Sequence, residues 1–256
     1  MAAPHREEGP IAPRRRLRRW GLGLAVGLVA VSAVLGARRL AARPRVPVRA
    51  VLAGGAATAF TLHVPHLPGS IVLDGDTDDP GWTLPPGPAR TGAFVNAAGV
   101  ESRPYSEARA AWGDGHLYFS LYAADEDIRS ATTEHDGPVW LDDSFRLVFT
   151  QPDGERAIEV SPRGVVTDGR RSPGGTFDYG WESGAHVSPE LDGTLNDSKD
   201  SDEEWVIEMA IPFEALGMNG ESGETVGFSV RRCDTLKSGT RVCSAWGAGQ
   251  GVLRLE

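Results

Sequence analysis

Apolar and polar residues alternate over many short segments of this chain, a pattern typical of β-strands that bury one face. The clearest case is the segment 138–149. A strand there would carry an apolar face and a mostly polar face. The apolar face, interrupted by Asp143, holds Val139, Leu141, Phe145, Leu147 and Phe149. The other face holds Trp140, Asp142, Ser144 and Arg146.

Other short apolar or alternating segments follow one another along the chain, separated by turn residues. They are 71–73, 108–112, 116–122, 157–160, 164–167, 205–211 and a final pair within 226–246. The turn Gly113-Asp114-Gly115 predicts a hairpin between two of them. Only 213–217 suggests a helical turn. This pattern predicts an all-β protein, a two-sheet antiparallel β-sandwich.

Two longer stretches are expected to be loops. The segment 170–181 is rich in glycine and holds three aromatic residues, and the segment 192–204 is acidic. Long loops on a sandwich often carry binding residues. Tyr179 and Trp181 are therefore candidate ligand contacts, with anchoring of the loop as the alternative.

The polar face around Trp140 is poor material for a protein core. An indole beside a carboxylate (Asp142) and a guanidinium (Arg146) suits a ligand that is flat and apolar on one side and polar at its edges. A sugar ring is such a ligand. The alternatives are a buried Trp140 that fills the core and an Arg146 that only forms a surface ion pair.

Charge divides the chain of 256 residues into two unlike parts. Residues 1–50 carry eleven arginines and two glutamates, whereas the remainder has a net charge of −18. The uncharged run 20–37 follows a basic segment 1–19 and is long enough to cross a bilayer as a helix. It predicts a transmembrane signal anchor, with a cleaved signal peptide as the alternative. The acidic remainder argues against a nucleic-acid partner.

These segments give a domain organisation and a location. Residues 38–68 are expected to be a linker with a short strand near 60–64, and 69–256 the globular domain. We expect the N-terminus in the cytoplasm and the domain outside it, in the periplasm or beyond the cell. Cys233 and Cys243 flank a turn between two predicted strands, so an exported domain would join them in a disulfide. Two buried thiols are the alternative.

Closely spaced aspartates form a candidate metal site. Asp74, Asp76 and Asp78 could supply oxygen ligands to calcium. The EF-hand pattern fails, because its twelfth position is Pro85 rather than glutamate. A solvated turn closed by aspartate side chains is the alternative.

Four motifs in order resemble family-nine carbohydrate-binding modules. They are 71–82 (Ile-Val-Leu-Asp-Gly … Trp), Leu117-Tyr118 followed by Asp125-Glu126-Asp127, 138–143 (Pro-Val-Trp-Leu-Asp-Asp) and 205–213. The similarity spans about residues 70–250. It implies a β-sandwich that binds the ends of saccharides, with calcium as a structural ion.

In this family two tryptophans enclose the sugar. The resemblance places Trp140 at the first position, and Trp246 on the last hairpin is the candidate for the second. The sequence departs from the family at Arg146, where a glutamate is usual. An arginine only donates hydrogen bonds, so it would favour acidic sugars or mark a lost site.

The function predicted from sequence is non-catalytic carbohydrate binding by a membrane-tethered domain, associated with polysaccharide degradation or cell-surface glycans. The familiar hydrolase, metalloprotease and phosphate-loop motifs do not occur. One alternative is a haem-binding redox sandwich with axial ligands from His116, Met209 and Met218. Another is an envelope structural or interaction domain with a decayed sugar site.

Overall fold

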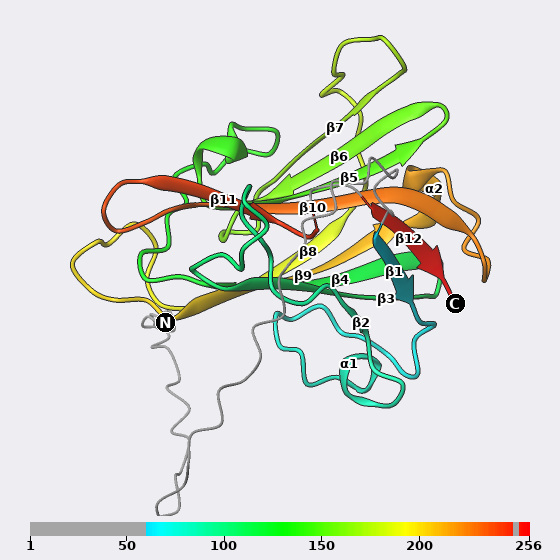
Figure 1. The fold of residues 1–256 in the computed structure, drawn as a ribbon, viewed down its shortest axis with the longest axis horizontal. Coiled ribbons are helices and arrows are strands. Elements are labelled where there is room, and N and C mark those ends of the chain that lie inside the picture. Colours follow the sequence, from blue (N-terminus) through cyan, green and yellow to red (C-terminus); the bar gives the residue numbers. More distant parts are fainter. Residues whose placement is uncertain (1–59, 248–250) are drawn as a thin grey trace, which may run out of the picture. The chain divides into compact units, whose positions relative to one another are not determined.

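The computed structural model describes residues 60–247 and 251–256, which form two β-sheets packed face to face (Figure 1). The larger sheet has seven strands. Six follow the order β1 (Phe60–Val64), β12 (Gly251–Leu255), β10 (Thr225–Thr235), β5 (Ser144–Gln151), β6 (Gly154–Val160) and β7 (Val166–Arg171). The seventh, β11 (Arg241–Ala245), pairs with β10 beyond the end of β12.

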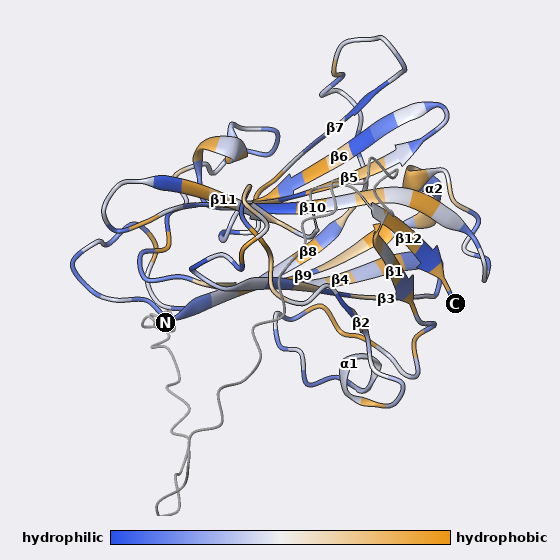
Figure 2. Ribbon diagram, viewed as in Figure 1, coloured by the Kyte–Doolittle hydropathy of each residue, from blue (hydrophilic) through white to orange (hydrophobic). Residues whose placement is uncertain are grey.

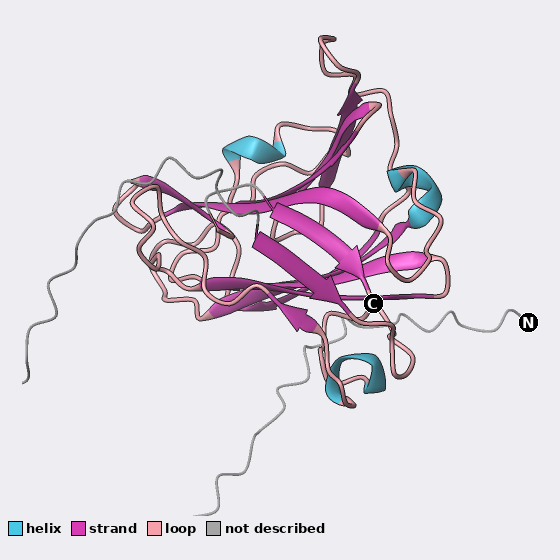
Figure 3. Ribbon diagram, turned by 45° about the vertical axis from the view of Figure 1, so that its right-hand side comes forward, coloured by secondary structure: helices cyan, strands magenta, loops and turns pink. Residues whose placement is uncertain are grey.

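The smaller sheet has five strands, all antiparallel to their neighbours. Their order is β2 (Ala89–Arg90), β3 (Ser106–Gly113), β4 (His116–Ala124), β9 (Glu204–Pro212) and β8 (His186–Asp192). The helices are single turns outside the two layers (Figure 3): α1 (Pro80–Thr83), η1 (Val139–Leu141) and α2 (Phe213–Leu216). The predicted two-sheet antiparallel β-sandwich is confirmed, and β1 adds one parallel pairing, with β12.

The core lies between the sheets and is made by alternate residues of each strand. Apolar and polar residues alternate along the strands, as Figure 2 shows. Phe119, Phe149 and Phe228 meet in the middle, with ring centroids 5.4–6.2 Å apart. These side chains come from β4, β5 and β10, so they join the two sheets. Burial of such large apolar surfaces is the main stabilising term of the fold.

The chain enters β5 through a turn where the alternating pattern predicts a strand. Residues 139–141 form η1, and β5 begins at Ser144. Asp142 and Asp143 are 5% and 0% exposed, and their carboxylates accept backbone N–H groups. A buried carboxylate needs such donors, and the turn brings them within reach. The prediction of one strand over 138–149 is therefore wrong for its first half.

The second half of that prediction is confirmed. Phe145, Leu147 and Phe149 are fully buried on the inner face of β5. Arg146 lies on the outer face and is partly exposed. Leu141, which was expected on the apolar face, is instead 69% exposed, because it belongs to η1.

The sandwich includes a strand that we expected in the linker. The short strand near 60–64 is present as β1. Its Leu62 and Val64 are 5% and 0% exposed and belong to the core. β1 therefore packs as part of the sandwich.

The last hairpin is joined by the expected disulfide. Cys233 of β10 lies directly opposite Cys243 of β11, and the two sulfurs are bonded. A disulfide is typical of proteins in oxidising compartments. It fixes β11 against β10, and β11 carries a residue that matters for the candidate site below.

The predicted transmembrane segment 20–37 lies outside the described residues. Among residues 60–247 and 251–256, no helix is both long and apolar enough to cross a membrane.

Truncating Leu62 tests whether β1 is part of the folded unit. Leu62→Ala should lower the free energy of unfolding by about 2–5 kcal/mol, because it opens a cavity under β1. Thr61→Ala, at the exposed neighbouring position, is the control and should change it by less than about 0.5 kcal/mol. Chemical denaturation of both variants makes the comparison. Equal stabilities would show that β1 does not contribute to the core.

Candidate functional site

A tight turn holds Trp140 at the surface of the larger sheet. The neighbouring Val139 is fully buried and anchors η1, whereas Trp140 is 44% exposed. Below the turn, the carboxylate of Asp142 accepts the backbone N–H groups of Ala131 and Thr132 at 3.0 and 2.9 Å. Asp142, a candidate ligand contact in the sequence, is thus buried and supports the turn.

Arg241 of β11 holds the same turn from its other end. Its guanidinium donates to the backbone carbonyls of Trp140 and Asp142 at 2.8 and 2.9 Å. The carbonyls at the end of a helical turn lack partners within the helix, and a cation there is favourable. Because the disulfide at Cys243 fixes β11, Arg241 links Trp140 to a firmly attached strand.

Aromatic residues of the loop after β7 continue the surface that Trp140 begins. The rings of Trp140 and Tyr179 lie 6.3 Å apart, and those of Tyr179 and Phe177 lie 5.1 Å apart. Tyr179 is 47% exposed and Phe177 is partly buried. We call Trp140, Phe177 and Tyr179 the aromatic platform.

Arg146 borders the aromatic platform on the outer face of β5. Its guanidinium lies 5.6 Å from the centre of the Phe177 ring, a cation–π contact. It also donates to the buried carboxylate of Glu159, on the neighbouring strand β6, at 2.9 Å. Arg231 of β10 lies opposite Arg146 on the other side and is exposed. This cross-strand row therefore holds two arginines and one carboxylate.

The structure brings some of the predicted site residues together and separates others. Trp140, Tyr179 and Arg146 share one surface, and Trp181 is partly buried in the same loop. Trp246 is only 7% exposed and packs against Phe228 in the core, with ring centroids 5.9 Å apart. It is therefore not a second exposed tryptophan beside Trp140.

The aspartates at 74–78 form a turn that is attached to the smaller sheet. The backbone N–H groups of Asp74 and Gly75 donate to the carboxylate of Glu208, at 3.0 and 2.8 Å, and so does the Trp82 indole, at 2.6 Å. The Asp74 side chain accepts the backbone N–H of Asp76. These contacts agree with the solvated-turn alternative, since the Asp74 and Asp76 side chains are exposed.

A different set of carboxylates converges where β4 ends, β5 begins and β10 ends. Ligand atoms of Asp125, Asp143 and Asp234 lie within 4.8 Å of one another, and all three residues are buried. Arg232 donates to Asp125 at 2.8 Å, while neither oxygen of Asp234 has a hydrogen-bond partner. We call these three aspartates the acidic triad. The arrangement could hold a metal ion, because three buried carboxylates exceed one guanidinium in charge.

The pKa values of the acidic triad reflect this uncompensated charge. Burial, reinforced by Asp125, raises the pKa of Asp143 to about 8. Burial also raises the pKa of Asp234 to about 6, although Arg232 acts in the opposite direction. A cation bound among the carboxylates would supply the missing positive charge.

The residues proposed as haem ligands make other contacts in the part of the chain that the structure describes. Met209 and Met218 are 0% and 6% exposed and pack in the core. The imidazole Nδ1 of His116 lies 2.7 Å from the carbonyl oxygen of Asp114. The two candidate methionine ligands are thus engaged in core packing.

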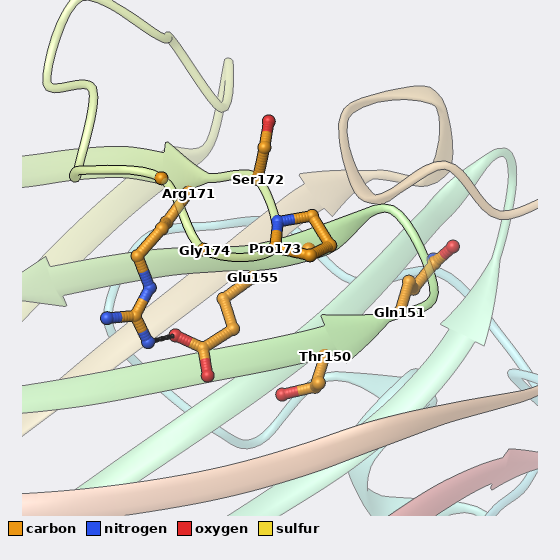
Figure 4. Close-up of a pocket in the computed structure, with 9 residues that line it drawn as sticks. Thr150, Gln151, Glu155, Arg171, Ser172, Pro173 and Gly174 are labelled. Atoms are coloured by element: carbon orange, nitrogen blue, oxygen red, sulfur yellow. Dashed lines mark hydrogen bonds and ion pairs between the residues drawn. The ribbon is translucent and has the colours of Figure 1, made fainter.

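Grooves lie on other parts of the surface. One encloses about 740 Å³ beside Trp246, Val95 and Arg231. Another lies at the β5–β6 hairpin, where the Arg171–Glu155 ion pair crosses between strands and Thr150 and Ser172 border it (Figure 4). The residues of the aromatic platform do not line either groove.

Three residues of the site could not be singled out from the sequence. Phe177 stands two positions before Tyr179, and this alternation of aromatics was its only local signal. Arg241 and Asp234 reach their partners through strand pairing between distant segments. Such pairing is set by the whole sheet, so spacing along the chain does not reveal it.

Comparison with known proteins supports the same fold. No family model and no curated protein matches the sequence. A Bacteroides uniformis protein provisionally described as carbohydrate-binding superposes with a TM-score of 0.60 and 16% identity, over 78% of this chain and all of that one.

Two structures of a family-nine carbohydrate-binding module (CBM9) from Caldicellulosiruptor kristjanssonii are also similar. The complex with cellotriose gives a TM-score of 0.51 at 16% identity, over 77% of this chain and 94% of that one. The complex with glucose gives 0.51 and 16%, over 77% and 96%. The chain thus has the β-sandwich fold of these modules, as its motifs predicted.

Loss of Arg241 should loosen the turn that carries Trp140. Arg241→Ala removes hydrogen bonds to the carbonyls of Trp140, Leu141 and Asp142, so we expect a loss of about 1–2 kcal/mol in unfolding free energy and faster amide exchange over 138–142. Lys237→Ala, at another exposed cation of the same hairpin, is the control. Hydrogen exchange read by mass spectrometry measures the effect. Unchanged exchange in the arginine variant would show that Arg241 does not hold the turn.

Proposed function

We propose that this protein binds saccharides without catalysis, through the aromatic platform. The observation that carries the proposal is the exposed pair of Trp140 and Tyr179, 6.3 Å apart, on a fold shared with carbohydrate-binding modules. Exposed apolar residues that adjoin one another on a surface often mark a site of interaction. The C–H face of a pyranose stacks well on an indole.

The groups beside the aromatic platform bear on the class of saccharide. Arg146 and Arg231 are hydrogen-bond donors, and the Glu159 carboxylate is already shared between Arg146 and Ser144. A ligand bound beside these residues would meet more hydrogen-bond donors than free hydrogen-bond acceptors. We infer that a sugar carrying a carboxylate is preferred over its neutral counterpart.

Two buried carboxylates, Glu159 and Glu208, lie on different sheets. Glu159 lies on the outer face of the larger sheet, and Glu208 lies on the outer face of the smaller one beneath the turn at 74–78. A glycosidase needs two carboxylates on either side of one bond. Binding rather than hydrolysis is therefore the proposed activity.

We further propose that the domain works outside the cytoplasm, tethered through the segment 20–37. The disulfide between Cys233 and Cys243 supports export. The uncharged run 20–37 after five closely spaced arginines supports an anchor. A tethered binding domain would retain polysaccharide fragments or surface glycans near the cell.

Truncation of Trp140 tests the saccharide proposal. Full-length protein in a detergent without a sugar headgroup is titrated with glucose, cellotriose and glucuronic acid by calorimetry. Trp140→Ala should weaken binding by at least about tenfold, because a central aromatic contact is lost. Leu141→Ala is the matched control, since Leu141 is an exposed apolar neighbour in the same turn.

The same sugar titrations distinguish saccharide binding by the aromatic platform from the alternative functions. Binding by the parent protein that Trp140→Ala removes and Leu141→Ala retains would support the aromatic platform. Equal affinities in all three proteins would contradict it. Folded protein that binds none of the sugars, and none on a wider glycan array, would favour an envelope interaction domain.

We propose that the acidic triad holds a structural calcium ion. Calcium prefers carboxylate oxygens, and neither oxygen of Asp234 accepts a hydrogen bond, although the Arg232 guanidinium lies 3.6 Å from its Oδ2. Asp125 and Asp143 would supply further oxygens, while Arg232 keeps Asp125 in position. The ion would join β4, β5 and β10 at the end of the sandwich nearest the Trp140 turn.

Calcium should therefore stabilise the protein through Asp234. Calcium at about one hundred times its Kd should raise the melting temperature of chelator-treated protein by roughly 5–10 °C. Asp234→Asn should lose most of this shift, whereas Asp192→Asn, at an exposed carboxylate, should keep it. Differential scanning fluorimetry measures the shift. A full shift in the Asp234 variant, or none in the parent protein, would contradict the proposal.

A further inference from the structure

A second cluster of metal-ligand atoms lies beside the aromatic platform, apart from the acidic triad. Ligand atoms of His135, Asp136 and Asp168 lie within 4.8 Å of one another. His135 and Asp136 belong to the loop before η1, and Asp168 belongs to β7. The set contains an imidazole, which the acidic triad lacks.

Asp168 is the feature that points to a ligand. The residue is only 2% exposed. Its Oδ2 accepts the backbone N–H of Ser183 at 2.7 Å, but its Oδ1 is buried and has no hydrogen-bond partner. A buried carboxylate oxygen without a partner is costly, so such an oxygen generally meets a donor or a cation. A carboxylate oxygen of Asp168 lies within 4.8 Å of ligand atoms of His135 and Asp136.

A further carboxylate, that of Glu182, lies beside His135 at the exposed side of this cluster. The carboxylate of Glu182 lies 2.9 Å from Nε2 of His135, and the carboxylate of Asp136 lies 3.8 Å from the same nitrogen. The side chains of His135 and Glu182 are 54% and 60% exposed. The cluster therefore has a buried floor at Asp168 and an open side through which an ion can enter.

The loop that carries two of these ligands is already docked on β7. The backbone N–H of Asp136 donates to the carbonyl of Val166 at 3.0 Å, and the hydroxyl of Thr167 donates to the carbonyl of Gly137. These contacts keep His135 and Asp136 next to Asp168. A site whose ligands are held in advance binds its ion with less loss of conformational entropy.

We propose that His135, Asp136, Asp168 and Glu182 form a binding site for a divalent first-row transition metal such as Zn²⁺. One imidazole with carboxylates suits zinc, which takes four nitrogen, sulfur or oxygen ligands in a tetrahedron. Calcium takes six to eight oxygens and suits the all-carboxylate acidic triad better. The two clusters thus differ in the ion they favour.

The bound metal would connect the segments on both sides of the aromatic platform. Trp140 follows Asp136 by four residues, and Tyr179 precedes Glu182 by three. A metal bound by Asp136, Glu182 and Asp168 of β7 would therefore restrain the segments that carry Trp140 and Tyr179. The metal site does not depend on what the aromatic platform binds.

Calorimetry with zinc tests the site directly. Full-length protein without a polyhistidine tag, freed of metal by a chelator, is titrated with ZnCl₂ and separately with CaCl₂. We expect zinc binding that His135→Ala and Asp168→Asn each weaken at least about tenfold, as loss of a ligand outweighs loss of a supporting residue. Asparagine at 168 can still accept the Ser183 N–H, so this variant should fold.

His63→Ala is the matched control, because His63 is an exposed histidine whose Nδ1 lies 2.6 Å from the carboxylate of Glu256. It should bind zinc like the parent protein. Zinc should also slow amide exchange over 176–184. No zinc binding by the parent protein, equal binding by the Asp168 variant, or loss of binding only in His63→Ala would overturn the proposal. So would unchanged exchange over 176–184.

Discussion

Two adjacent buried carboxylates, those of Asp142 and Asp143, decide how the chain enters the central strand β5. Each must find donors when it leaves water, and each finds backbone N–H groups of the segment 129–132, with Thr235 adding a second donor to Asp143. The chain meets this demand by turning at 138–143 instead of extending. That turn points Trp140 outward and brings Asp143 into the acidic triad.

The same turn is braced by contacts from distant parts of the chain. Arg241 holds it through the carbonyls of residues 140–142, and the disulfide at Cys243 holds the strand that carries Arg241. The loop after β7 adds Tyr179 to the surface. Aromatic residues on turns that are held by such contacts need little rearrangement to meet a ligand, so less of the interaction energy is lost to ordering.

The sequence could predict the sandwich because alternation and turn residues are local signals. The inner face of β5 and the pairing of Cys233 with Cys243 are confirmed for this reason. The turn at 138–143 was missed because a period of two cannot distinguish a strand from a turn whose carboxylates are buried. β1 was assigned to the linker because its partner, β12, lies almost two hundred residues away.

The candidate site was predicted only where its residues were conspicuous in the chain. Trp140 and Tyr179 could be chosen as an exposed indole and a loop aromatic, but their proximity depends on how the loop after β7 folds back. Trp246 was chosen by resemblance, and its packing against Phe228 places it in the core. Glu159 pairs with Arg146, and Arg231 on the neighbouring strand adds a second guanidinium to the same cross-strand row.

The proposed mode of saccharide binding requires that Trp140, rather than Trp246, contacts the sugar. Indole resonances of ¹⁵N-tryptophan-labelled protein can be followed by NMR during titration with glucuronic acid, with Trp140→Phe used to assign the signal. The indole N–H of Trp140 is predicted to shift with ligand concentration, while that of the buried Trp246 stays in place. A shift of the Trp246 indole resonance, with no shift of the Trp140 resonance, would contradict saccharide binding through the aromatic platform.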